Sequence, residues 1–250
     1  MNSATADTPV FQQAAQAYAR GQRAQAAQLA HQVLQQTPQH PGALFLLGSI
    51  LLDKGQTLEA LPYLQAAARL EPAHAGILRA LGTAHFNLEQ WQSAAWQFDR
   101  ALHCGPADAG LLNNFGLTLK ELGDTDAAIE IYRRALQLDP RDARIYNNLA
   151  IALNRKHDYS AAIEAYRRSV ELDGHNPAVW SNLATLLEQT NRLEETEEAL
   201  AQALQLEPHS AALALISAKC ARRRGHPETA IANLHDALSQ SPLNSELRRK

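Results

Sequence analysis

The sequence predicts an all-α protein built as a solenoid of about seven helix-turn-helix hairpins. Three observations lead to this prediction: a composition that favours helices, helix-ending residues that recur at a fixed period, and small and large residues that alternate within each period. The 250-residue chain is 46% hydrophobic and only 6% aromatic. Much of its apolar content is Ala and Leu, which favour helices, whereas the strand formers Val, Ile and Tyr are sparse.

Prolines mark a period of 34 residues along the chain. They are Pro38, Pro72, Pro106, Pro140, Pro208 and Pro242, and Gly174, another helix terminator, stands at the position that this series skips. A fixed period of this length is typical of repeat architectures in which each unit is one small structural motif. Counted from these residues, the units begin at Asp7, Pro41, Ala75, Ala109, Ala143, Pro177 and Ala211.

Small and large residues hold fixed places within these units. On the first helix, the seventh residue is large in units two to six and the eighth is Gly or Ala, as in Leu81 and Gly82. On the second helix, the twentieth residue is almost always Ala and the twenty-fourth is large, as in Ala94 and Phe98. Small residues let two helix backbones approach, and the large ones fill the space beside them. The pattern therefore predicts two closely packed helices per unit.

The fifteenth place of each unit predicts the turn between its two helices. Four units have glycine there, at Gly21, Gly55, Gly123 and Gly225. Glycine readily adopts the left-handed conformation that ends many helices. His157 and Asn191 replace glycine in two other units, and asparagine tolerates this conformation better than histidine does.

The pattern resembles the tetratricopeptide repeat, and the resemblance covers nearly the whole chain. It is clearest in the run from Tyr146 to Ala150, followed by Ala162, Tyr166 and the terminator Gly174. The resemblance implies a right-handed superhelix in which the first helices line a concave face. It extends to the repeat regions of O-GlcNAc-transferase-like and sulfotransferase-like proteins. The first and seventh units fit least well, as terminal repeats often do.

The array is predicted to span residues 7–244. Residues 1–6 are expected to form a disordered N-terminus, and residues 245–250 the start of an incomplete eighth unit. Arrays of the family commonly finish with a solvating helix, and none fits here. Two interpretations stay open: the chain is the N-terminal part of a longer protein, or it ends in a short frayed tail.

Asparagines recur on the first helices at places that, by the resemblance, face the concave groove. The sixth place holds Asn114, Asn148 and Asn182, and the fifth holds Asn113 and Asn147. Each amide has both donors and an acceptor, so a row of amides can bind the backbone of an extended peptide whatever its sequence. This arrangement resembles the asparagine ladder of O-GlcNAc transferase and kinesin light chain. The alternative is that these amides only satisfy local backbone groups.

Basic residues at other groove places predict a stripe that attracts an acidic segment or a carboxylate terminus of a partner. They are Arg79, Lys120, Arg144, Arg155, Arg222 and Arg223. The alternative is a solvated helix surface, because Glu121 and Glu188 share this face and dilute its charge.

The sequence predicts a scaffold without catalytic activity. It contains no His-x-x-x-His or Cys-x-x-Cys metal motif, no Gly-x-Ser-x-Gly elbow and no glycine-rich phosphate loop, so no metal or cofactor is expected. The ten histidines lie mostly near unit ends, and Trp96 and Trp180 are predicted to lie in or near the core. The functional alternative is the substrate-docking region of a larger sulfotransferase or glycosyltransferase, implied by the resemblance alone.

Charge and hydropathy narrow the expected partners to proteins and peptides. The net charge of −3 argues against nucleic-acid binding. The longest apolar run, residues 43–52, is too short to span a bilayer, and the N-terminus lacks the features of a signal peptide, so no membrane association and a cytoplasmic location are expected. Self-association through the last unit is a further alternative.

Overall fold

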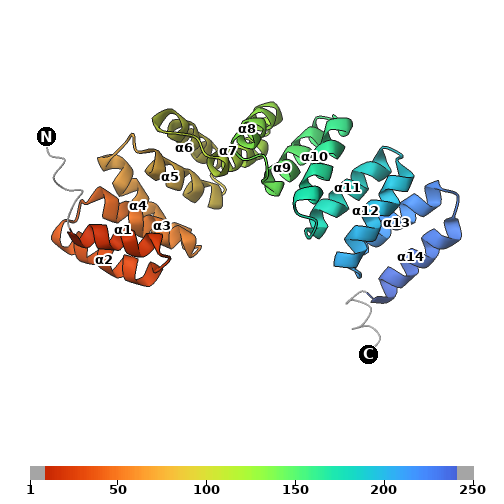
Figure 1. Cartoon of the computed structure of the whole chain (residues 1–250), viewed down its shortest axis with the longest axis horizontal. Helices are drawn as coiled ribbons and strands as arrows, with labels where there is room; N and C mark the ends of the chain where they lie inside the picture. The colour runs from red at the N-terminus through yellow and green to blue at the C-terminus, as the bar shows by residue number, and fades with distance from the viewer. Residues whose placement is uncertain (1–8, 241–250) are drawn as a thin grey trace. The chain divides into compact units, whose positions relative to one another are not determined.

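The computed structural model describes residues 9–240, and this part of the chain consists of fourteen α-helices without strands (Figure 1). Their bounds are α1 Pro9–Ala19, α2 Arg23–Gln36, α3 Pro41–Asp53, α4 Thr57–Leu70, α5 Ala75–Asn87, α6 Trp91–Cys104, α7 Ala109–Glu121, α8 Thr125–Leu138, α9 Ala143–Arg155, α10 Tyr159–Leu172, α11 Pro177–Gln189, α12 Leu193–Leu206, α13 Ala211–Arg223 and α14 Pro227–Gln240. The predicted all-α fold of about seven hairpins is confirmed. The expected disordered stretch at 1–6 and the incomplete unit at 245–250 lie outside the described residues.

The chain divides into two compact units, Met1–Ala127 and Ala128–Lys250. In the first, α1 packs mainly on α2, α3 on α4, and α5 on α6, and each second helix also contacts the first helix of the next hairpin. In the second, the hairpins α9–α10, α11–α12 and α13–α14 are joined in the same way. Within each compact unit, consecutive hairpins therefore pack against each other, as the hairpins of repeat arrays do.

Side chains of the residues directly before the predicted unit starts cap several of the first helices. Asp108 Oδ1 accepts a hydrogen bond from the Leu111 backbone N–H at 2.7 Å, and Asn176 Oδ1 accepts one from Ala178 at 3.1 Å. In two hairpins the capping residue is a histidine: the Nδ1 atoms of His40 and His74 each accept a hydrogen bond from a backbone N–H at 3.2 Å. These caps satisfy donors that the first turn of a helix leaves without a partner.

The turn inside each hairpin contains a left-handed residue, as predicted. The four glycines at the fifteenth place have φ angles between 74° and 85°, and His157 and Asn191 have 61° and 60°. Glu89, which sequence reasoning did not single out, holds the same place with a φ of 56°. The conformation is thus imposed by the hairpin geometry, because three residues other than glycine adopt it at the same place of the period.

The core confirms the alternation of small and large residues. A β-carbon on Gly48 would lie 2.6 Å from the Cγ and Cδ2 atoms of Leu64, so α3 and α4 can cross this closely only because Gly48 has no side chain. In the second unit, Ala150, Ala162 and Tyr166 are buried in the corresponding hairpin. The helices therefore pack through one narrow contact per hairpin, with a large side chain beside it.

One core prediction was wrong. Trp96 on α6 is 58% exposed, and the Arg100 guanidinium lies 4.5 Å from the centre of its indole ring. Trp96 stands two residues before the buried Phe98, a spacing that in a helix places two side chains on different faces.

Candidate functional site

The asparagines of the proposed ladder lie on first helices in both units. Asn113 and Asn114 are on α7 in the first unit, Asn147 and Asn148 are on α9 in the second, and Asn182 is on α11 in the second. All five side chains are partly buried. Within the second unit, Asn148 and Asn182 are one period of 34 residues apart, so they hold the same place in consecutive hairpins.

The hydrogen bonding of these amides differs from residue to residue. Asn113 and Asn148 each have an interaction partner within the protein. The Oδ1 atom of Asn147 is buried without a hydrogen-bond partner. Among residues 9–240, no hydrogen bond joins the side chain of Asn114 or Asn182 to another group. The last two amides thus keep all their donors and acceptors available to a ligand.

The predicted basic residues of the first unit are paired with carboxylates. Arg79 Nη1 lies 2.7 Å from Oδ2 of Asp108, the residue that caps α7, and Lys120 Nζ lies 2.8 Å from Oε1 of Glu121. The positive charge of both residues is therefore largely offset where they stand.

The predicted basic residues of the second unit include both paired and unpaired side chains. Arg144 lies 2.7 Å from Asp142, and its hydrogen bonds hold the pKa of that carboxyl below its usual value. Arg223 Nε lies 3.0 Å from Oε1 of the buried Glu188. Arg155 is exposed and has an interaction partner, whereas exposed Arg222 has no side-chain hydrogen bond or ion pair among the described residues. The structure therefore offers less free positive charge than the sequence suggested.

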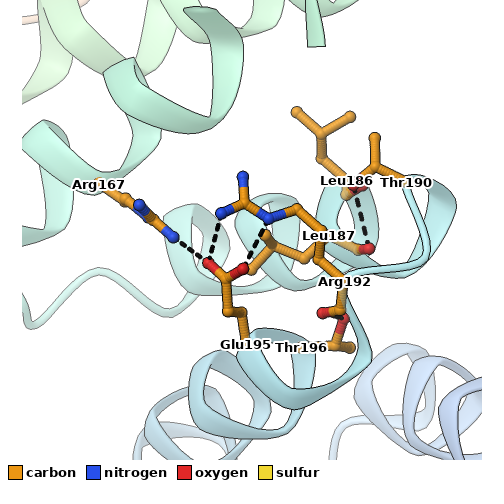
Figure 2. Close-up of polar contacts among 7 residues, drawn as sticks. All are labelled: Arg167, Leu186, Leu187, Thr190, Arg192, Glu195 and Thr196. Carbon is orange, nitrogen blue, oxygen red and sulfur yellow. Dashed lines mark hydrogen bonds and ion pairs between the residues drawn. The ribbon is translucent and has the colours of Figure 1, made fainter. Parts of the chain in front are cut away.

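A carboxylate between two arginines links consecutive hairpins of the second unit (Figure 2). Glu195 on α12 accepts hydrogen bonds from Arg192 Nε at 2.6 Å and Arg192 Nη2 at 2.9 Å, and it also pairs with Arg167 on α10. Nearby, the Thr190 hydroxyl donates to the carbonyl oxygen of Leu186 at 2.8 Å (Figure 2). These contacts fix the start of α12 against the preceding hairpin.

Two kinds of feature are absent from the described part of the chain. No group of three or more His, Cys, Asp or Glu side chains lies close enough together there to hold a metal ion. None of the helices described between residues 9 and 240 combines the length and the apolar character needed to cross a membrane.

Sequence comparison identifies the repeat. Two family models, both described as tetratricopeptide repeat, match the chain: one over residues 11–67, 51–109 and 113–177, the other over residues 153–220. Together they cover most of the sequence. No curated protein matches the chain.

Solved structures of low sequence identity share the fold. The chain is similar to PilF of Pseudomonas aeruginosa, with a TM-score of 0.67, 23% identity, and coverage of 84% of this chain and 96% of that one. It is also similar to YrrB, described as a TPR protein with an unusual peptide-binding site (TM-score 0.66, 18% identity, 75% and 96% coverage). A tetratricopeptide repeat protein from Parabacteroides merdae matches with a TM-score of 0.64 at 15% identity, over 96% of this chain and 95% of that one. At these identities the likeness establishes the fold alone.

Proposed function

Because the chain belongs to the tetratricopeptide repeat family, we propose that it is a protein-interaction scaffold that binds an extended peptide through asparagine side chains on its first helices. Tetratricopeptide repeat proteins generally mediate interactions between proteins, and stacked repeats offer long surfaces for this purpose. The proposal does not include catalysis, because the residues of the chain form no motif for it.

The observation that supports the proposal most directly is the hydrogen bonding of Asn182. Its amide is partly exposed, stands in the middle of α11, and has no hydrogen-bond partner among the described residues. Asparagine is a mediocre helix former, so helix propensity does not account for it there. One period earlier, Asn148 holds the same place on α9, and Asn114 holds it on α7 in the other unit.

A peptide bound by such amides would be held weakly. Each net hydrogen bond contributes about 1 kcal/mol, and ordering the peptide removes several kcal/mol of the total. Three amides with about two bonds each contribute about 6 kcal/mol before that cost, so they alone support a dissociation constant no tighter than about 1 mM. Additional contacts are required for specificity.

The basic residues supply some of these contacts in the proposal. Arg222 is the clearest candidate for attracting an acidic segment, because its side chain makes no ion pair among residues 9–240. A carboxylate that binds Arg79 or Arg144 has to share the guanidinium with Asp108 or Asp142. A bidentate guanidinium can contact two carboxylates, so sharing is feasible, but it weakens the attraction.

The test is a peptide-array screen with the purified chain, followed by titration calorimetry of the best peptide against variants. Asn182→Ala and Asn148→Ala should each weaken binding about five- to thirtyfold, which corresponds to the loss of one or two hydrogen bonds. Gln205→Ala removes an exposed amide from the second helix α12 and serves as the matched control. If the asparagine variants bind as tightly as Gln205→Ala, the peptide is held elsewhere and the proposal fails.

Three further hypotheses drawn from the sequence remain predictions. These are service as the docking region of a larger sulfotransferase or glycosyltransferase, self-association, and a cytoplasmic location. No contact among the described residues favours any of them, and the compared structures show the fold alone.

A further inference from the structure

A second surface, whose lining includes none of the five asparagines, has the form of a binding site. In the second unit, side chains of α10, α11 and α12 line an open cleft of about 360 Å³. This volume lies at the lower end of the range of ligand-binding pockets, which is roughly 300–1,000 Å³. Asn182 does not line the cleft, although Trp180 and Leu183 of the same helix do.

The floor of the cleft is apolar and consists of core residues. It is formed by Val170 of α10, Leu183 and Leu187 of α11, and Ala199 of α12, all buried residues of the core. The indole of Trp180 forms one wall, and its Nε1–H donates to the carbonyl oxygen of Gly174 at 2.9 Å. This bond holds the ring in place. The floor therefore suits a straight apolar chain, which can lie along it and be shielded from water.

The rim is acidic, and one of its carboxylates lacks a cation. Glu195 is held by two arginines, and Glu171 lies 2.8 Å from Arg168. Glu198, which is exposed and also lines the cleft, has no side-chain hydrogen bond or ion pair among the described residues. Three glutamates and one arginine line the cleft, so its lining carries a net negative charge, and Glu198 is the glutamate without a partner in the described part of the chain.

From these two features we propose that the cleft binds a lysine or arginine side chain of a partner protein. The aliphatic stem would lie on the floor beside Trp180, and the cationic head would pair with Glu198. Long basic side chains bury their methylene groups against apolar surfaces while keeping the charge at the edge, which is the geometry that the cleft offers. Arg167, the one cation that lines the cleft, is paired with Glu195 and is outnumbered there by three carboxylates. This partner contact is independent of the peptide binding proposed for the first helices.

The test uses n-hexylammonium as a stand-in for the basic side chain, titrated into the full chain and followed by NMR. The indole N–H signal of Trp180 and the methyl signals of Leu183 and Leu187 should shift and saturate. 1-Hexanol has the same stem without charge and should bind about two- to fivefold more weakly, the worth of an exposed ion pair. Hexanoate should bind more weakly still, because Glu198 repels it.

Glu198→Gln tests the charge. It should bring n-hexylammonium and 1-hexanol to equal affinity, whereas Glu197→Gln, which changes a neighbouring carboxylate that is paired with Arg224, should keep the preference. A peptide with lysine between glycines should displace n-hexylammonium, and the same peptide with norleucine should do so about two- to fivefold less effectively. Equal binding of hexanoate, shifts that spare Trp180, or a preference that survives Glu198→Gln would each overturn the proposal.

The outcome is separable from that for peptide binding by the asparagines. Asn182→Ala should leave the n-hexylammonium titration unchanged, since this residue does not line the cleft. A loss of n-hexylammonium binding in that variant would also count against the assignment of the cleft.

Discussion

Gly82 and Phe98 meet where α5 and α6 cross: a β-carbon on Gly82 would lie 2.5 Å from the Cδ1 and Cε1 atoms of the Phe98 ring. Phe98 is completely buried, so the ring has little room to move aside. The two residues are 16 positions apart in the sequence, and their contact sets how closely the two helices of this hairpin approach.

Gly82→Ala should therefore destabilise the protein by about 1–3 kcal/mol, the usual cost of overfilling a packed core. Chemical denaturation measures the change. Phe98→Leu, which makes room, should recover part of the loss in the double variant even though it is destabilising alone. An unchanged midpoint in Gly82→Ala would mean that the hairpin can open without cost.

Glu89→Gly should stabilise the protein by about 0.5–1 kcal/mol. The φ of Glu89 is 56°, a conformation that costs a residue with a side chain about 1–2 kcal/mol, and only part of this gain is lost to the greater chain entropy of glycine. Gln92→Gly, at an exposed position in the first turn of α6, is the control and should destabilise the protein by up to about 1 kcal/mol. The two variants should shift the thermal midpoint in opposite directions. A lower midpoint in both variants would contradict the proposed backbone strain at Glu89.

His40 should make stability depend on pH below neutrality. The residue is 1% exposed, its Nδ1 accepts the capping bond from Ala43, and burial lowers its pKa from 6.5. As the pH falls below about 6.5, the unfolded chain takes up this proton before the folded one does, so the free energy of unfolding decreases until the lowered pKa is reached. A favourable interaction of the cation with Glu71 reduces the shift without reversing it.

Thermal midpoints measured between about pH 7 and pH 5 check this. His40→Asn keeps a capping side chain but cannot titrate, so its midpoint should fall less than that of the unaltered protein. His74→Asn changes the exposed histidine that caps α5 in the same way and should retain the full slope. Identical slopes in all three proteins would remove His40 as the cause.

Arg223→Ala should destabilise the protein by about 1–3 kcal/mol, because it leaves the carboxylate of Glu188, which is 5% exposed, without its cation. Urea titration gives the value. Arg222→Ala, at the exposed neighbouring position, should stay within about 0.5 kcal/mol of the unaltered protein. In the double variant with Glu188→Gln, the loss should shrink. Effects of Arg223 variants on binding should accordingly be read only after correction for stability.

Asn182→Ala should leave the thermal midpoint unchanged or raise it slightly, because alanine is the better helix former by up to about 0.7 kcal/mol and no hydrogen bond of this side chain is lost. Circular dichroism during heating measures this. A clear fall in the midpoint would show that the amide supports the fold, which would count against its proposed use in binding.

Much of the fold was predictable because the determinants of each hairpin are local. A period of 34 residues marks where helices end, small residues mark where they cross, and the fifteenth place marks the turn. The same reasoning missed Glu89, because glutamate is not a residue type that indicates a left-handed conformation. It also placed Trp96 in or near the core, because the sequence near an aromatic residue does not show which face of the helix that residue occupies.

The candidate site was less accessible to sequence reasoning. The sequence by itself determined the hairpins and which residue types recur on their first helices. Helix formation, turns and repeat spacing depend on neighbours within one hairpin, and these neighbours are close in the sequence. Only the tertiary structure decided which charges are matched: Glu195 meets Arg167 and Glu188 meets Arg223, pairs 28 and 35 residues apart. It also decided that Glu198 is left unmatched beside an apolar cleft. Such features arise where consecutive hairpins pack, and the free energy of that packing depends on side chains from both hairpins.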